Sequence, residues 1–278
     1  MTNVRSSSVA VQSQTYSNTS DSIADKVAIS LAFGKAAQSY DKHAAFQRDV
    51  ADRLLSLLPE NLLGAQILDL GCGTGYCTEQ LIQRGAVVTC ADLSEKMLEQ
   101  AKVRCGRSAK DYVIADAERL PFDAESFDLV VSSLALQWCE DLAVPLNEMK
   151  RVTKKGGKLL FSTLLDGSLH ELKESWSKID THQHVNDFIC LDRLNIALAQ
   201  SACVNHRLDL PQIVVWYQTA FELMRDLKGI GANHIENRSQ GLVSRSVLQG
   251  VETEYRQFRN ELGLLPASYH VCLGAIQL

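Results

Sequence analysis

The chain has 278 residues, a formal net charge of −5 and a hydrophobic content of 46%. This length allows one large domain, or one domain with an insertion, and the hydrophobic content is ordinary for a globular protein with a full core. The negative charge argues against a nucleic-acid partner, which would require a basic face. No apolar run is long enough for a membrane helix, and the N-terminus has no charged-then-apolar signal pattern.

The eight cysteines are scattered, and they form no C-x-x-C pair. We therefore expect no metal site. A chain of this length does not need disulfides, so reduced cysteines are the simplest interpretation. These observations predict a cytoplasmic protein that binds neither nucleic acid nor a membrane.

The N-terminal part of the chain divides into a polar tail and a helical segment. Residues 1–22 are rich in Ser, Thr, Asn and Gln, which predicts a disordered tail. Apolar residues over 46–58 recur at helical spacing, and Pro59 ends that helix. Residues 33–44 are an unusual mixture for a simple helix, so we predict that 23–60 is a helical lid over a cofactor.

The chain is organised around residues 67–76, ILDLGCGTGY. The apolar start suits a buried parallel strand, and a helix is expected over 76–84. Gly71 and Gly73 permit positive φ and a close approach of a ligand to the backbone. The helix N-terminus points its free N–H groups at that ligand. We predict a cofactor cradle at the carboxyl end of the first strand of a doubly wound sheet.

The glycine spacing indicates which cofactor is bound. It is G-x-G-x-G and differs from the dinucleotide fingerprint G-x-G-x-x-G. Asp69 precedes the first glycine, and its carboxylate is awkward beside a pyrophosphate but useful beside a cationic ammonium or sulfonium. The stretch 69–75, with Cys72 between two glycines, resembles motif I of the class I S-adenosylmethionine-dependent methyltransferases. The resemblance implies S-adenosylmethionine as the cofactor.

The second strand, 86–92, ends in Asp92. An acid at this strand tip accepts both ribose hydroxyls of a bound nucleoside. The alternative is that Asp92 only caps the following helix. Leu93 and Met97 follow it and are further candidates for contact with the cofactor.

The tips of the next two strands complete the predicted cofactor site. Asp116, Ala117 and Glu118 follow a strand over 112–115. A carboxylate can accept from the adenine amino group, and a backbone N–H can donate to a ring nitrogen. Ser133 and Leu134 leave the tip of the strand over 127–132, where the reacting methyl should lie.

The second half of the chain predicts an insertion and a closing strand. A fifth strand is expected over 158–163, and residues 166–260 are mainly helical, with one strand-like run at 213–217. A last strand over 268–276 closes the chain. We predict an α/β fold with a doubly wound, seven-stranded mixed sheet whose last strand is antiparallel. The methyltransferase domain would span 23–278, with 166–260 as a helical, substrate-binding insertion.

From about residue 33 to residue 274 the chain is similar to the malonyl-acyl-carrier-protein O-methyltransferases of biotin synthesis. The most specific matches are 134–139 (LALQWC) and 227–234 (LKGIGANH). Ser133 replaces the asparagine usual in that family. The resemblance implies methyl transfer from S-adenosylmethionine to the free carboxylate of malonyl-acyl carrier protein. A methyltransferase acting on a quinone, phenol or amine would share the first-half motifs, whereas a non-catalytic regulatory protein would show a degraded motif I.

Four residues are candidates for the catalytic site. Tyr40, on the predicted lid, is the first candidate for orienting the methyl or the carboxylate, with packing as the competing interpretation. His43, Gln137 and Trp138 are further candidates, and Trp138 could equally serve packing. No general base is expected, because a carboxylate acceptor is already ionised at neutral pH.

Docking of an acidic carrier protein requires a local basic patch, because the chain itself is net negative. The basic residues between 151 and 158 belong to the amino edge of the sheet, away from the cofactor. The helical insertion offers a better-placed set, and its cations are Arg225, Lys228, Arg238 and Arg245. A solvated helix face is the alternative explanation for this set.

Overall fold

The computed structural model describes residues 19–232 and 244–278. Most of the predicted tail, 1–18, lies outside these ranges. The first helix begins at Thr19, so the last residues assigned to the tail, 19–22, are helical.

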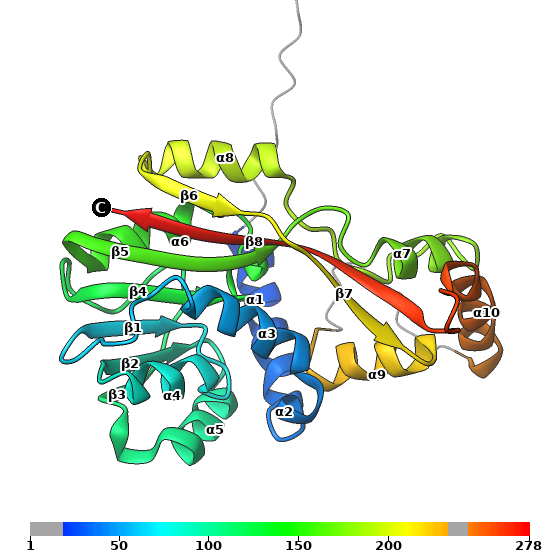
Figure 1. Ribbon diagram of the computed structural model, residues 1–278, viewed down its shortest axis with the longest axis horizontal. Helices are drawn as coiled ribbons and strands as arrows, with labels where there is room; N and C mark the ends of the chain where they lie inside the picture. Colours follow the sequence, from blue (N-terminus) through cyan, green and yellow to red (C-terminus); the bar gives the residue numbers. More distant parts are fainter. Residues whose placement is uncertain (1–18, 233–243) are drawn as a thin grey trace, which may run out of the picture.

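A central sheet carries the fold (Figure 1). Its strands are β1 (Gln66–Leu70), β2 (Val87–Asp92), β3 (Asp111–Ile114), β4 (Phe127–Ser133), β5 (Thr153–Leu164), β6 (His206–Asp209), β7 (Gln212–Tyr217) and β8 (Leu265–Gln277). Their order across the described residues is β3-β2-β1-β4-β5-β8-β6, and β7 also pairs with β8. The first five strands are parallel, and β8 is antiparallel to β5, β6 and β7. The doubly wound mixed sheet is confirmed, with one more strand in the described ranges than the seven predicted.

The additional strand is β6. It is short and polar, and three of its four residues are exposed. Only Leu208 packs against the hydrophobic core. Because the strand lies at the sheet edge and buries one side chain, it lacks the apolar run by which the other strands were predicted.

Helices cover both faces of the sheet. They are α1 (Thr19–Ala36), α2 (Tyr40–His43), α3 (Ala45–Leu55), α4 (Tyr76–Gln83), α5 (Glu95–Cys105), α6 (Ala143–Val152), α7 (His170–Ser177), α8 (Leu191–Gln200), α9 (Ala220–Gly229) and α10 (Arg245–Tyr255). Ile67 of β1 packs into one core with Leu54 of α3 and residues of α4. The next residue, Leu68, packs into a second core with Leu146 of α6 and residues of α8. This alternation explains why the strand is continuously apolar: both of its faces are buried.

Strand β8 serves two parts of the molecule. Residues 271–277 pair with β5 inside the sheet, whereas 265–270 pair with β7 beyond it. We call β7, residues 265–270, α7, α9 and α10 the arm; Figure 1 shows it extending from the sheet around the long red strand. Gly274 lies where the sheet packs most closely, since a Cβ there would lie 2.2 Å from the Phe161 ring.

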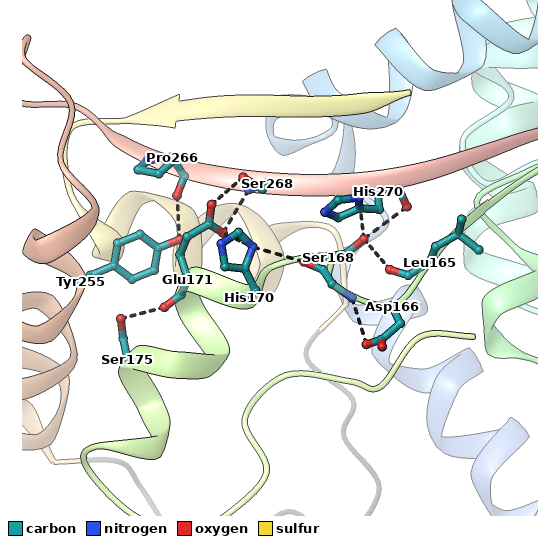
Figure 2. A network of polar contacts seen from close by, with 11 residues as sticks. Leu165, Asp166, Ser168, His170, Glu171, Ser175, Tyr255, Pro266, Ser268 and His270 are labelled. Carbon is teal, nitrogen blue, oxygen red and sulfur yellow. Dashed lines mark hydrogen bonds and ion pairs between the residues drawn. The ribbon is translucent and has the colours of Figure 1, made fainter. Parts of the chain in front are cut away.

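Two polar anchors fix the arm helices to β8 (Figure 2). Glu171 of α7 is 2% exposed, and its carboxylate accepts hydrogen bonds from the Ser268 hydroxyl at 2.5 Å and the Ser268 N–H at 3.2 Å. The Tyr255 hydroxyl of α10 donates to the Pro266 carbonyl at 2.8 Å. Because a buried polar group without a partner destabilises the fold, these bonds specify how α7 and α10 dock.

No helix in the described ranges has the length and apolar character that crossing a membrane requires.

Candidate functional site

The main cavity lies at the carboxyl ends of β1, β2 and β4, where the order of the strands reverses. Ligands of doubly wound sheets bind at this switch point. We call it the strand-tip cavity; it encloses about 780 Å³. Its floor includes Gly71, Asp92 and Leu134, and α1 covers it with Ile29 and Phe33. The helices of the predicted lid therefore form one wall of this cavity.

The glycine loop gives the cavity a bare backbone wall. Gly71 has φ +71°, and a Cβ there would lie 2.3 Å from the Ala135 Cβ. Gly73 has φ +54°, and a Cβ there would meet no atom within 4 Å. The first glycine is required by close packing, and the second leaves space for a ligand beside the backbone. The loop has the open backbone that the motif predicted, and binding of the cofactor at Gly71 and Gly73 stays a prediction.

Asp92 both holds the glycine loop and lines the strand-tip cavity. Its Oδ2 accepts from the Gly73 N–H at 2.9 Å, and its Oδ1 accepts from the Ser94 N–H at 2.8 Å. Burial raises the pKa of Asp92, although these two N–H groups act in the opposite direction. Each oxygen retains a lone pair that can accept from a hydroxyl. Ser94 directly precedes α5, so Asp92 also accepts a hydrogen bond at the start of this helix. The alternative interpretation of Asp92, a contact with the following helix, therefore applies in part.

Asp69 faces a second space, between the glycine loop and α3. We call it the glycine-loop cavity; it encloses about 460 Å³, and Cys72 also lines it. Asp69 is 1% exposed and accepts from the Thr78 hydroxyl at 2.6 Å. Burial raises the pKa of Asp69 to about 6. A cation in this cavity would oppose that rise, so the position suits an ammonium.

The predicted adenine-side residues divide into two groups. Asp116 and Ala117 line the strand-tip cavity, whereas Glu118 is not part of its wall. Glu118 instead forms an ion pair with Lys26 of α1, whose Nζ also lies 2.6 Å from Asp116 Oδ2. The contact of Glu118 with the cofactor stays a prediction. Lys26 has no local sequence signal, since it precedes Asp116 by 90 positions.

The remaining predicted cofactor residues lie where the sequence placed them. Leu93, Met97, Ser133 and Leu134 all line the strand-tip cavity. Leu134 has φ +50°, an uncommon conformation for a branched residue. Its N–H donates to the carbonyl and to the hydroxyl of Ser162, at 3.1 and 3.0 Å. These bonds hold the turn that leads from β4 into the site.

A third space adjoins the strand-tip cavity on the side of the arm. We call it the arm cavity; it encloses about 680 Å³. Phe33, Tyr40, Leu134 and Trp138 line both of these cavities. Trp138 packs edge-on against Phe33 at 5.2 Å between ring centroids, so it serves packing and the site together. Tyr40 lines the strand-tip, arm and glycine-loop cavities.

Two amides in the arm cavity have unsatisfied atoms. The Oε1 atoms of Gln47 and Gln137 are buried and have no hydrogen-bond partner in the described parts of the chain. An unpartnered buried polar atom costs about 1–3 kcal/mol. The arm cavity therefore presents two acceptor atoms that the described protein groups leave unpaired. Gln47 was not predicted, because it lies on α3 within an ordinary helical pattern.

His43 does not join the other catalytic candidates. Its Nδ1 lies 2.7 Å from Asp226 Oδ1, and its ring fills the space beside Gly229, where a Cβ would lie 2.2 Å from it. It lines none of the three cavities. His43 therefore joins α2 to α9 in the structure, and its catalytic role stays a prediction.

The predicted docking cations are accessible. Arg225, Lys228 and Arg245 are exposed, and none forms an ion pair with another described residue. Arg238 lies outside the described residues. In contrast, Lys154 pairs with Asp128 and Lys155 pairs with Glu125 at the amino edge of the sheet.

The described residues contain no group of three or more His, Cys, Asp or Glu side chains that could hold a metal ion.

The strand order and the acid before the glycine loop together make this site suited to a cationic cofactor that carries a nucleoside. These features define a class I S-adenosylmethionine-dependent methyltransferase. A family model described as "Methyltransferase domain" matches residues 68–161. The malonyl-[acyl-carrier protein] O-methyltransferase of Salmonella typhimurium is 40% identical over 254 residues, which are 91% of this chain and 98% of that relative. The chain therefore belongs to the malonyl-[acyl-carrier protein] O-methyltransferase family.

Two further comparisons agree with this assignment. The biotin biosynthesis bifunctional protein BioHC of Cellvibrio japonicus is 39% identical over 248 residues, covering 89% of this chain and 49% of that protein. Among solved structures, the YcgJ protein of Bacillus subtilis superposes with a TM-score of 0.59 at 16% identity, covering 83% of this chain and 98% of its own. At this identity the structural likeness concerns the fold alone.

The chain is an S-adenosylmethionine-dependent methyltransferase, and its site fits that cofactor. The open backbone at Gly73 leaves room for the ligand, and the Asp92 carboxylate offers acceptors to ribose hydroxyls. The buried Asp69 offers a negative charge near the loop. The residues present therefore match the shape and the charge of the cofactor.

Proposed function

We propose that this protein transfers the methyl group of S-adenosylmethionine to the free carboxylate of malonyl-acyl carrier protein. Two findings support the proposal: the family to which the chain belongs, and an arm cavity that adjoins the cofactor site. The product is a methyl ester, in which the terminal charge is masked. Fatty-acid synthesis could then elongate the chain toward the pimeloyl unit of biotin. Because its substrate is a carrier protein of that synthesis, we place the reaction in the cytoplasm.

The observation that carries the proposal is the pair of amides with unpaired atoms in the arm cavity, whose lining also includes the polar residues His184 and Asn186. Gln47 and Gln137 present buried atoms without partners there. An amide presents either its oxygen or its NH₂ group when its side chain is rotated. A carboxylate only accepts hydrogen bonds, so it would be bound by the NH₂ groups. A malonyl group is short and anionic, so it would occupy only a part of this cavity, beside a few polar positions.

The reaction requires alignment more than acid–base chemistry. When bound, S-adenosylmethionine supplies an electrophilic methyl group on a sulfonium. A carboxylate acceptor has a pKa of about 4 and is ionised at neutral pH, so no residue has to remove a proton. Phe33 and Trp138 cover the junction of the two cavities and exclude water. The rate gain would arise from holding the two reactants in line.

Tyr40 is the residue best placed to orient the reactants. It borders both the strand-tip cavity and the arm cavity. Burial raises the pKa of Tyr40, and the nearby Asp92 carboxylate acts in the same direction. The phenol therefore remains protonated at neutral pH and can donate a hydrogen bond to an acceptor carboxylate.

A comparison of acceptors tests the proposed function. The purified protein is incubated with S-adenosylmethionine and either malonyl- or acetyl-acyl carrier protein, and products are identified by intact mass. We expect methylation of the malonyl form alone, with one S-adenosylhomocysteine formed per ester. Equal methylation of the acetyl form, or methylation only within a panel of quinones, phenols and amines, would overturn the proposal.

We further propose that the carrier protein docks on the exposed cations of the arm. The proposed patch comprises Arg225 and Lys228 on α9 and Arg245 on α10; Arg238, the fourth cation of the sequence prediction, lies outside the described residues. Acidic carrier proteins complement such a patch. α9 also contributes Leu227 to the arm cavity, so a carrier bound there would place its prosthetic arm near the cavity.

A further inference from the structure

The glycine-loop cavity contains a positive group that the predicted site does not use. The cavity meets the strand-tip cavity at Gly71, Gly73 and Ser133, so both spaces adjoin the same loop. Asp69 lies on its loop side. Arg48, on α3, lines the same cavity. The cavity therefore carries one buried acid and one guanidinium.

The Arg48 guanidinium is only partly satisfied by the protein. Its Nη1 donates to the Asp41 carbonyl at 2.7 Å. No carboxylate lies within ion-pair distance of Arg48 in the described ranges: the Asp41 carboxylate is bonded to Thr74 and Arg104, and the Asp52 carboxylate accepts from a tyrosine hydroxyl. A guanidinium has five N–H donors in a planar fork. Apart from this bond, the fork makes no hydrogen bond or ion pair with the described residues, and Arg48 lines the cavity.

Other arginines near this wall are already engaged. Arg53 on the same helix pairs with Asp49 at 3.1 Å, and Arg104 of α5 pairs with Asp41. Arg84 donates to the Leu55 carbonyl at 2.8 Å. Among the described arginines of this region, Arg48 alone combines a place in the cavity wall with no carboxylate partner.

We propose that Arg48 binds the α-carboxylate of the methionine portion of S-adenosylmethionine, while Asp69 binds the α-ammonium of the same portion. The methionine portion is a zwitterion. In this cavity Arg48 offers it a guanidinium and Asp69 a buried acid, whereas the carboxylate of Asp41, the second acid of the lining, is bonded to Thr74 and Arg104. A guanidinium binds a carboxylate through two parallel N–H···O bonds, which fixes orientation as well as charge.

A structural role for Arg48 is the competing explanation. Its bond to the Asp41 carbonyl holds the end of α2 against α3. In that case, substitution would alter thermal stability and weaken every ligand of the site to a similar extent. Under our proposal, the loss is confined to ligands that carry the amino-acid portion.

Two ligands separate these explanations. S-adenosylhomocysteine carries the amino-acid portion, whereas 5′-methylthioadenosine has the same adenosine and thioether without it. Calorimetric titration of Arg48→Gln should show roughly tenfold or weaker affinity for S-adenosylhomocysteine and unchanged affinity for 5′-methylthioadenosine. Arg53→Gln on the same helix is the matched control, and it should bind both ligands like the wild type.

Arg48→Lys keeps the positive charge without the planar fork, so its affinity for S-adenosylhomocysteine should be intermediate. It also provides the same measurement if Arg48→Gln does not fold. Equal losses for both ligands, or unchanged S-adenosylhomocysteine affinity in a folded variant, would overturn the role of Arg48. A failure of the malonyl assay with normal S-adenosylhomocysteine binding would overturn the proposed acceptor and leave this inference standing.

Discussion

Asp92 connects the glycine loop to the ribose position of the cofactor. Asp92→Ala removes the acceptor of the Gly73 N–H together with the expected acceptor of the ribose hydroxyls. Hydrogen bonds to a charged group contribute roughly 1.5–3 kcal/mol, so the affinity for S-adenosylhomocysteine should fall about tenfold or more. Calorimetry measures this, with Glu95→Ala, an exposed acid at the start of α5, as the control. Unchanged affinity in a folded Asp92→Ala variant would contradict the assignment.

Asp69 should make cofactor binding depend on pH. Burial raises its pKa in the folded protein to about 6, above the value of 3.8 expected when unfolded. Folding therefore disfavours the ionised carboxylate. As the pH rises through that interval, this group lowers the free energy of unfolding of the ligand-free protein. Binding of an ammonium requires the ionised form. The affinity for S-adenosylhomocysteine should consequently decrease as the pH falls through about 6.

Asp69→Asn separates the two effects. The variant should bind S-adenosylhomocysteine more weakly at neutral pH and should lose most of the pH dependence. Its ligand-free unfolding midpoint at neutral pH should rise by roughly 2 °C or more, because the buried charge is gone. Calorimetry and thermal unfolding measure these changes. A pH profile identical to that of the wild type would assign the titration to another group, such as Asp92.

Tyr40→Phe tests whether the hydroxyl orients the reactants. The ring and its packing remain, so S-adenosylhomocysteine affinity should stay near that of the wild type. The kcat should fall roughly tenfold or more, because a hydrogen bond to a charged acceptor is lost. Steady-state kinetics with malonyl-acyl carrier protein measures this. An unchanged kcat would leave packing as the role of Tyr40.

At the scale of elements, the anchor between α7 and β8 should be important for stability. Ser268→Ala removes a hydroxyl donor from the Glu171 carboxylate, which has little contact with solvent. The free energy of unfolding should decrease by about 1–3 kcal/mol, which chemical denaturation can measure. Ser177→Ala, an exposed serine on α7 that bonds only to its own helix, is the control. Equal effects of the two substitutions would mean that the anchor contributes little.

The elements that the sequence predicted are those with strong local patterns. Parallel strands such as β1 and β4 are apolar runs because both faces are buried, and the antiparallel β8 was recognised by its apolar residues over 268–276. β8 itself begins at Leu265, before that apolar run. β6 was missed because an edge strand with one inward side chain has no such pattern.

The residues of the site also divide into those with a local sequence pattern and those without one. Gly71, Gly73 and Asp92 belong to short motifs whose spacing reflects one strand–helix–strand unit. Lys26 and Arg48 were missed, because they reach the site from helices that precede the sheet. Only the folded chain brings these side chains to the strand tips, and a positive residue on a helix is ordinarily solvated.

At the scale of the whole molecule, the distribution of charge determines how a carrier protein would approach. Arg225→Glu and Lys228→Glu should raise the KM for malonyl-acyl carrier protein without altering S-adenosylhomocysteine affinity. The effect should be larger at low salt, since exposed charges are screened beyond about 10 Å at 0.1 M ionic strength. Steady-state kinetics at two salt concentrations measures this.

The control for docking is the basic cluster at the opposite edge of the sheet. Lys154→Glu and Lys155→Glu alter residues that are already paired with Asp128 and Glu125. These variants should keep the wild-type KM. If they impaired the carrier reaction while the variants of α9 did not, docking would have to occur on the amino edge.

The position of β8 in the sheet has a consequence for the newly made chain. Within residues 19–232 and 244–278, β6 and β7 pair with no strand other than β8, and β5 has β8 as its neighbour on one side. During synthesis these three strands therefore emerge before their partner exists. Their open edges would be templates for pairing with other chains. The sheet and the arm can be completed only once residues 265–277 are available for pairing, and until then the edges of β5, β6 and β7 are open to other chains.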